Sequence, residues 1–159
     1  MYQLLARHSG KALDVNGGSA ANEAKVQQWT AIDNNPNQQW VVTLQSDGAY
    51  TLTHQGTNSR LDVSYNSAED GATVWQYAAN DSPAQRWEIT ATDNGYYKLI
   101  HQGTNKVLRR ARRQERDRQW SQSDSVRIWG QRKPAVEAGA VEHGGYPAPA
   151  LSGPGQRPG

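Results

Sequence analysis

Short alternations of apolar and polar positions, bounded by clusters of Gly, Asn, Asp and Ser, run through the first 90 residues. Alternation with a period of two is typical of strands that bury one face, and the polar clusters are typical of turns. No segment shows a sustained helical period with capping residues. The pattern therefore predicts an all-β protein, whose first eight strands lie at residues 2–7, 12–15, 25–29, 39–44, 50–54, 60–63, 73–77 and 86–90.

The same order of strands and turns is repeated along the chain. Tyr2, Tyr50 and Tyr97 open corresponding stretches, 48 and then 47 residues apart. The first two stretches each carry Leu-Asp-Val and, further on, Gln-x-Trp, whereas the third matches only as far as Leu108. Three repeats of four short strands predict a closed all-β architecture, in which sheet edges are removed.

Leu-Asp-Val followed by Gln-x-Trp, occurring twice at matched spacing, resembles the ricin B-type β-trefoil lectins, which include the family 13 carbohydrate-binding modules. The resemblance implies a β-trefoil, a barrel capped by three hairpins, with carbohydrate as its partner, no catalytic activity and no required cofactor. We expect the trefoil at residues 1–137, with repeats at 2–49, 50–96 and 97–137 and the last repeat degraded after residue 108. A Gly- and Pro-rich tail at 138–159 is predicted to be disordered.

A sugar site needs an aromatic face for C–H groups and planar polar groups that select hydroxyls, and a carboxylate is the strongest acceptor. By resemblance, the aspartate accepts from adjacent hydroxyls, the ring stacks on the sugar, and amide side chains complete the site. Trp75 replaces Gln27 in the second repeat and Ala84 replaces Asn37, so we expect the first repeat to hold the better site, despite an extra residue in its loop. The candidate carbohydrate-binding residues are Asp14, Gln27, Trp29, Asn37 and Gln38, and Asp62, Tyr77, Asn80 and Gln85.

Other interpretations of these residues are structural. Trp40 and Trp87 follow strand alternation and are predicted to be core. Asp14 and Asp62 have a second interpretation, as turn residues whose side chains bond their own backbone. Trp29 and Tyr77 also have a second interpretation, as residues that pack within the hairpins. Recurrence at matched places in both repeats favours binding.

Catalytic and metal sites are not predicted. His8, His54 and His101 do not occupy equivalent places as a set, and the scattered Ser, His and Asp residues form no nucleophile motif. The pair Glu69-Asp70 lies in a polar stretch and is expected to be solvated.

Composition constrains the core and the location of the protein only slightly. With 35% hydrophobic residues and no Phe, six Trp and seven Tyr must supply the large buried side chains. Cysteine is absent, which leaves the redox compartment open, and no apolar run approaches a membrane helix. The resemblance implies an extracellular module of a larger protein, such as one with a hydrolase or toxin domain, and galactose- or xylose-type units as ligands.

Charge divides the chain at the point where the third repeat stops matching. Residues 1–108 carry a net charge of −3 and residues 109–159 carry +5. The Arg-rich segment 109–118 has three interpretations: a patch for nucleic acid or another polyanion, a localisation signal, or a frame-shifted translation. If the segment is a polyanion patch, the domain is a trefoil scaffold for protein or nucleic-acid interaction, and this is the alternative to carbohydrate binding. We favour the third.

The genetic code supports the frame-shift hypothesis. With a one-base offset, CGN arginine codons become GNN codons, so that Arg109-Arg110 can become Asp-Val and restore Leu-Asp-Val. Val136 can then become a Trp that lies 28 residues after Leu108, against 27 and 26 in the intact repeats. In the chain as written, we expect two barrel strands with unpaired edges and a strand at 126–129 without a native partner.

Overall fold

The computed structural model describes residues 1–110, 120–121 and 125–130, with side chains described for residues 1–108 and Ile128. The predicted tail at 138–159 lies outside the described residues, as do Val136 and most of the Arg-rich segment. The domain boundary at residue 137 therefore stays a prediction.

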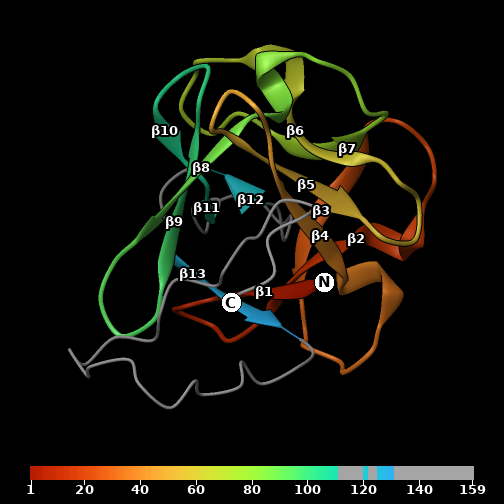
Figure 1. The fold of residues 1–159 in the computed structure, drawn as a ribbon. Helices are drawn as coiled ribbons and strands as arrows, with labels where there is room; N and C mark the ends of the chain where they lie inside the picture. The colour runs from red at the N-terminus through yellow and green to blue at the C-terminus, as the bar shows by residue number, and fades with distance from the viewer. Residues whose placement is uncertain (111–119, 122–124, 131–159) are drawn as a thin grey trace, which may run out of the picture.

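Strands make up almost all the regular structure of the described chain, and the expected all-β class is confirmed (Figure 1). Eleven of them form one continuous antiparallel sheet, and β11 and β12 form a separate pair. Each of the eight strands expected in the first two repeats is confirmed to within one residue at either end. The strands are β1 Tyr2–Ala6, β2 Ala12–Val15, β3 Ala24–Trp29, β4 Trp40–Leu44, β5 Tyr50–His54, β6 Arg60–Val63, β7 Val74–Tyr77, β8 Trp87–Ala91, β9 Tyr97–His101, β10 Lys106–Val107, β11 Arg109–Arg110, β12 Trp120–Ser121 and β13 Ser125–Gly130.

Strand pairing repeats with the period of the sequence. The last strand of repeat one, β4, meets β1 at Trp40 and Tyr2 and then pairs with β5 over five residues. In repeat two, β8 meets β5 at Trp87 and Tyr50 and pairs with β9 over five residues. The second and third strands of each repeat form the hairpins β2–β3 and β6–β7, which join through β3 and β7.

The third repeat closes the barrel in the same way, although its sequence does not match. Strand β13 meets β9 at Val126 and Tyr97, and it pairs with β1 over five residues, from Tyr2–Gly130 to Ala6–Val126. Val126 therefore holds the register position of Trp40 and Trp87. Our expectations of unpaired edges, and of a strand at 126–129 without a native partner, are both wrong.

The reason is that strand pairing needs alternation in register rather than a particular motif. Residues 125–130 alternate, and Ile128 is buried against the core, as Val42 is in the equivalent strand β4. Val126 lies 18 residues after Leu108, well short of the intact spacing, so the closing strand comes earlier than the repeat period indicates. The three-repeat barrel with its hairpins confirms the β-trefoil arrangement.

The core lies inside the barrel, where buried leucines surround two indoles. Trp40 and Trp87 are fully buried, which confirms their predicted core role. Each indole Nε1–H donates to a main-chain carbonyl of its own repeat at 3.1 Å, from Trp40 to Leu13 O and from Trp87 to Leu61 O. The other large, fully buried apolar side chains are Leu4, Leu13, Leu52, Leu61, Leu99 and Leu108. The two indole hydrogen bonds tie the last strand of repeats one and two to the base of the hairpin in the same repeat.

Candidate functional site

The hairpin β2–β3 gathers the first candidate site on its outward face. Asp14 pairs directly with Gln27, and directly opposed residues of an antiparallel pair share a face. Trp29 lies two residues beyond Gln27 and therefore on the same face, with 40% of its surface exposed. Asp14 itself is only 3% exposed.

Two carboxamides hold this carboxylate from opposite sides. Gln27 Nε2 donates to Asp14 Oδ1 at 3.0 Å, and Gln38 Nε2 donates to Asp14 Oδ2 at 3.1 Å. Gln38 is fully buried, so it contacts the aspartate from the core side. Its remaining partners are Thr30 O at 2.9 Å, Gln3 Nε2 at 2.7 Å and the main-chain N–H of Ile32 at 2.9 Å.

The turn η1 (Asn16–Gly18) brings a glycine that sequence analysis missed under the site. A Cβ at Gly18 would lie 2.5 Å from Asn37 Oδ1, so the half-buried Asn37 side chain rests directly on this glycine. Gly18 also has a φ of +62°, which other residues rarely adopt. The paired Gly17-Gly18 directly after the strand was the available signal.

The extra residue in the loop of repeat one does not disturb the site. It is accommodated at residues 33–34, where Asn34 adopts a φ of +59°. The loop is held as in repeat two, because the main-chain N–H of Ile32 donates to Gln38 Oε1 at 2.9 Å and that of Asn80 donates to Gln85 Oε1 at 3.0 Å.

Repeat two builds the same frame with a different covering residue. Trp75 Nε1 donates to Asp62 Oδ1 at 2.7 Å, where repeat one uses Gln27, and the fully buried Gln85 donates to Asp62 Oδ2 at 3.0 Å. Asp62 is 5% exposed, and burial raises its pKa, which the hydrogen bonds from Gln85 and Trp75 partly oppose. Tyr77, half-buried, takes the place of the first repeat's exposed tryptophan.

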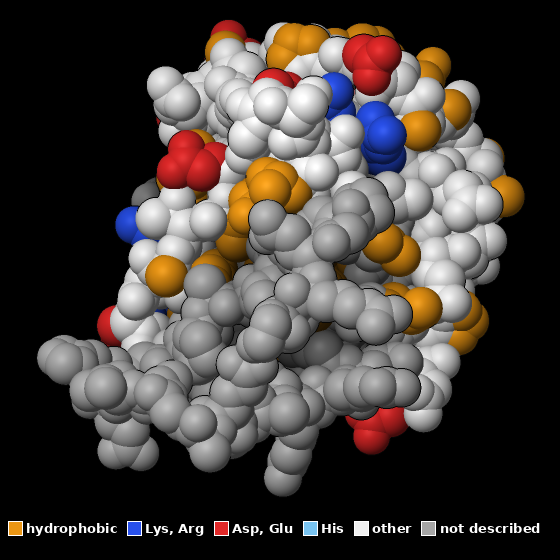
Figure 2. Space-filling view, in the orientation of Figure 1, with side chains coloured by type: hydrophobic (Ala, Val, Ile, Leu, Met, Phe, Trp, Pro, Cys, Tyr) orange, Lys and Arg blue, Asp and Glu red, His pale blue; other side chains and the backbone are white. Residues whose placement is uncertain are grey.

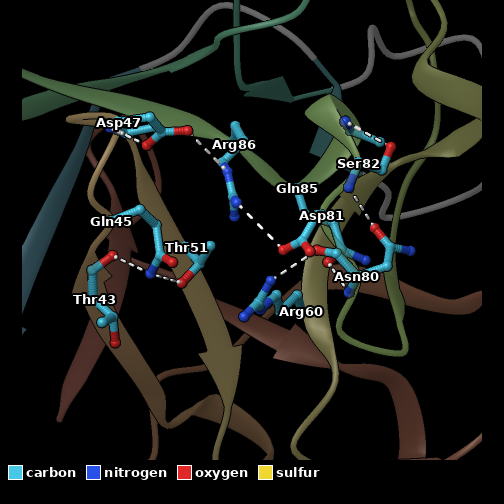
Figure 3. Close-up of polar contacts among 12 residues, drawn as sticks. Thr43, Gln45, Asp47, Thr51, Arg60, Asn80, Asp81, Ser82, Gln85 and Arg86 are labelled. Carbon is cyan, nitrogen blue, oxygen red and sulfur yellow. Dashed lines mark hydrogen bonds and ion pairs between the residues drawn. The ribbon is translucent and has the colours of Figure 1, made fainter.

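Two arginines brace the loop beside this second site (Figure 3). Arg60 Nη1 donates to Asn80 O at 2.8 Å, while the exposed Asn80 side chain accepts from the main-chain N–H of Ser82. The Arg86 guanidinium lies between two exposed carboxylates, 3.2 Å from Asp47 Oδ2 and 3.6 Å from Asp81 Oδ1. Asn80 is thus held as a turn residue at the rim of the site.

The place of Asn37 is taken in repeat two by the buried Ala84. An exposed aromatic residue, Tyr65, stands instead at the edge of the site, in the turn η3 (Ser64–Asn66). Its ring meets that of Trp75 edge-on, with centroids 5.3 Å apart. Sequence analysis missed it, although its place directly after Leu-Asp-Val-Ser was a signal.

The third repeat does not continue the set. Arg109 follows Leu108 at the place where Asp14 and Asp62 follow their leucines, so the carboxylate is missing from the sequence. Among the described residues, no group of three His, Cys, Asp or Glu side chains could hold a metal ion. No helix in this part of the chain is long and apolar enough to cross a membrane.

Acidic and basic side chains lie at scattered places in Figure 2, without an extended basic area among the described residues of that face. His54 and His101 are buried beside the rings of Trp40 and Trp87, and burial lowers the pKa of both histidines.

Fold and sites together define a lectin-type β-trefoil. The model of the ricin-type β-trefoil lectin domain-like family matches residues 1–77 and 36–122, and the chain belongs to this family. A comparison with curated protein sequences gives no match.

Solved structures agree on the fold. ThreeFoil, a designed protein with threefold symmetry, is 33% identical, with a TM-score of 0.75 over 81% of this chain and 97% of its own. An exo-β-1,3-galactanase from Clostridium thermocellum is 30% identical, with a TM-score of 0.72 over 80% of this chain but 29% of the enzyme. A ricin B-like lectin from Macrolepiota procera, solved with lactose, is 15% identical, with a TM-score of 0.65 over 80% of this chain and 92% of its own.

Proposed function

We propose that this domain is a non-catalytic carbohydrate-binding module that recognises sugar units of oligo- or polysaccharides at two hairpin sites. One observation carries the proposal: in both repeats an aspartate, fixed from below by a buried glutamine, lies beside an aromatic ring on the outward face of the hairpin. This is the combination that a sugar requires, because one face of a pyranose is apolar and its edge carries hydroxyls.

At the first site, Trp29 stacks on the C–H face of the sugar, and Asp14 accepts from neighbouring hydroxyls. The Asp14 carboxylate has about four acceptor positions, of which Gln27 and Gln38 occupy two. The outward Gln27 moves aside, so that a hydroxyl replaces its N–H and the freed carboxamide bonds a further hydroxyl. Asn37 adds another amide at the rim.

Gln38 and Gln85 act as positioning residues in this proposal. Both are fully buried, and their part is to fix the orientation of Asp14 and Asp62 rather than to contact sugar. A side chain with fixed hydrogen bonds loses little further freedom when ligand binds, which favours affinity.

Galactose- or xylose-type units are the proposed ligands, and the proposed location is extracellular. The exo-galactanase and the lectin solved with lactose support the galactose type. A single shallow site is expected to have a Kd on the order of 1 mM, or about 4 kcal/mol. Two sites on one polymer strengthen retention through effective concentration.

The test is retention of the domain on insoluble galactan and xylan. The chain should bind one of them, Trp29→Ala should lose most of the binding by its repeat, and Trp29→Ala combined with Tyr77→Ala should lose all of it. Unchanged melting temperatures provide the control, since Trp29 is exposed and Tyr77 half-buried. Full retention by the double variant would overturn the proposal.

Measuring retention at low and high salt on these polysaccharides and on immobilised DNA separates sugar binding from the use of the Arg-rich segment as a polyanion site. Contacts to phosphate weaken steeply with salt because counterions are released. Stacking on sugar responds little. Retention that falls with salt would therefore support the interaction-scaffold alternative.

A further inference from the structure

Repeat two carries a row of three aromatic rings, Tyr65, Trp75 and Tyr77, which we term the aromatic strip. The ring centroids of Tyr65 and Trp75 are 5.3 Å apart, and those of Trp75 and Tyr77 are 6.3 Å apart. Trp75 and Tyr77 share the outward face of β7, and Tyr65 extends the row from the turn η3. The corresponding residues of repeat one are Gly17, Gln27 and Trp29, so only one ring is present there.

The tyrosine at the end of the strip is held in a backbone conformation that favours glycine. Tyr65 has a φ of +53°, and Gly17, at the same place in repeat one, has a φ of +63°. A bulky residue in this region is strained relative to glycine. Tyr65 is 85% exposed, so its side chain gains little packing energy to offset the backbone strain. Strained residues of this kind concentrate at binding sites.

The middle ring of the strip is fixed, and this changes the chemistry of the site. The indole N–H of Trp75 is bonded to Asp62 Oδ1 at 2.7 Å, which orients the ring and occupies an acceptor position. Unlike Gln27, an indole has no second donor and no acceptor to offer to hydroxyls once that bond is made. Repeat two therefore presents more stacking surface and fewer polar groups than repeat one.

We propose that the aromatic strip binds consecutive sugar units of a chain, so that repeat two recognises oligosaccharides whereas repeat one recognises a single unit. The inference rests on the proposed function and specifies its substrate class. The spacing between neighbouring rings is comparable to the length of one pyranose unit, and the ring planes turn by 68° and 32° along the strip, so successive units of a twisted sugar chain can each meet a ring. Every pyranose presents a C–H face, and stacking therefore tolerates variation along the polymer.

The experiment measures monosaccharide and tetrasaccharide affinities by calorimetry in a Trp29→Ala background, which leaves repeat two as the binding site. Galactose and xylose are compared with the tetrasaccharides of β-linked galactose and xylose. Tyr65→Gly introduces the residue of repeat one and relieves the strain, so the variant should melt at or above the temperature of its parent. It should lose about tenfold in tetrasaccharide affinity, the equivalent of about 1.4 kcal/mol, and keep its monosaccharide affinity.

A transplant into repeat one serves as the matched control. In a Tyr77→Ala background, Gly17→Tyr with Gln27→Trp should raise the ratio of tetrasaccharide to monosaccharide affinity several-fold.

The outcomes separate the inference from the function beneath it. Unchanged tetrasaccharide affinity in Tyr65→Gly would overturn the inference alone, as would an equal loss for both ligands, because sugar would still bind. Failure of the unsubstituted chain to bind any of the four sugars would overturn the proposed function, and the inference with it.

Discussion

The two hairpin sites share a frame and differ in their covering residues. In both, a buried glutamine fixes an aspartate at the base of the hairpin with nearly the same distance, 3.1 Å in repeat one and 3.0 Å in repeat two. Above that frame, repeat one carries a carboxamide and a glycine turn, where repeat two carries Trp75 and Tyr65. The core restrains the inward residues of a hairpin, whereas outward residues are free to vary. One scaffold can therefore present a polar site and an aromatic site side by side.

The largest effect should separate frame from surface within repeat one. Trp40→Ala should lower the free energy of unfolding by about 3–5 kcal/mol, because a fully buried indole and its bond to Leu13 O are lost. Trp29→Ala should leave the free energy of unfolding nearly unchanged while removing most of the sugar binding by its repeat. Chemical denaturation of both variants tests this contrast. Equal destabilisation would mean that Trp29 belongs to the packing.

A second pair of changes compares the two frames directly. Gln38→Leu should cost about 3 kcal/mol, since a buried carboxylate and several other buried polar groups lose their partner. Gln85→Leu should cost less, about 2 kcal/mol, because Gln85 makes fewer bonds. Each change should also weaken sugar binding at its own repeat only. Denaturation gives the first result, and calorimetry with the other site silenced gives the second.

Acid should reveal a difference between repeats at one buried position. His54 and His101 occupy the place where repeat one has Ala6, and burial lowers the pKa of both histidines. In the unfolded chain both histidines take up protons near pH 6.5, whereas in the folded protein they take up protons only at lower pH. Stability is therefore constant above that pH and falls as the pH drops from about 6.5 through the lowered folded values.

Melting temperatures from pH 8 to pH 5 measure this loss of stability. A variant carrying His54→Gln and His101→Gln should show a flatter pH profile over the same window. An unchanged profile would assign the acid sensitivity to other groups.

The smallest effect concerns the loop beside the second site. Arg86→Gln introduces the residue that repeat one has at this place, Gln39, and removes the ion pairs to Asp47 and Asp81. Because both carboxylates are exposed, the change should cost only about 0.5–1 kcal/mol. It should shift the melting temperature slightly, and less so at high salt. A cost above that of Gln85→Leu would show that the bracing outweighs the frame.

Local pattern was sufficient for much of the molecule. Alternation placed eight strands to within one residue and marked Trp40 and Trp87 as core. Recurrence of an aspartate and an aromatic at matched places marked the two hairpins as candidate sites. These features depend on residues close in sequence, where period and spacing carry the information.

The amino-acid sequence by itself thus determined the strands, the repeats and the outline of the sites. Only the tertiary structure decided that β13 closes the barrel against β1 and β9, at a spacing the repeats did not indicate. It likewise placed Gln38 and Gln85 wholly beneath the surface and set Tyr65 against Trp75 in a row. The physical reason is that strand register and side-chain exposure depend on packing between segments far apart in the chain, which no local period records.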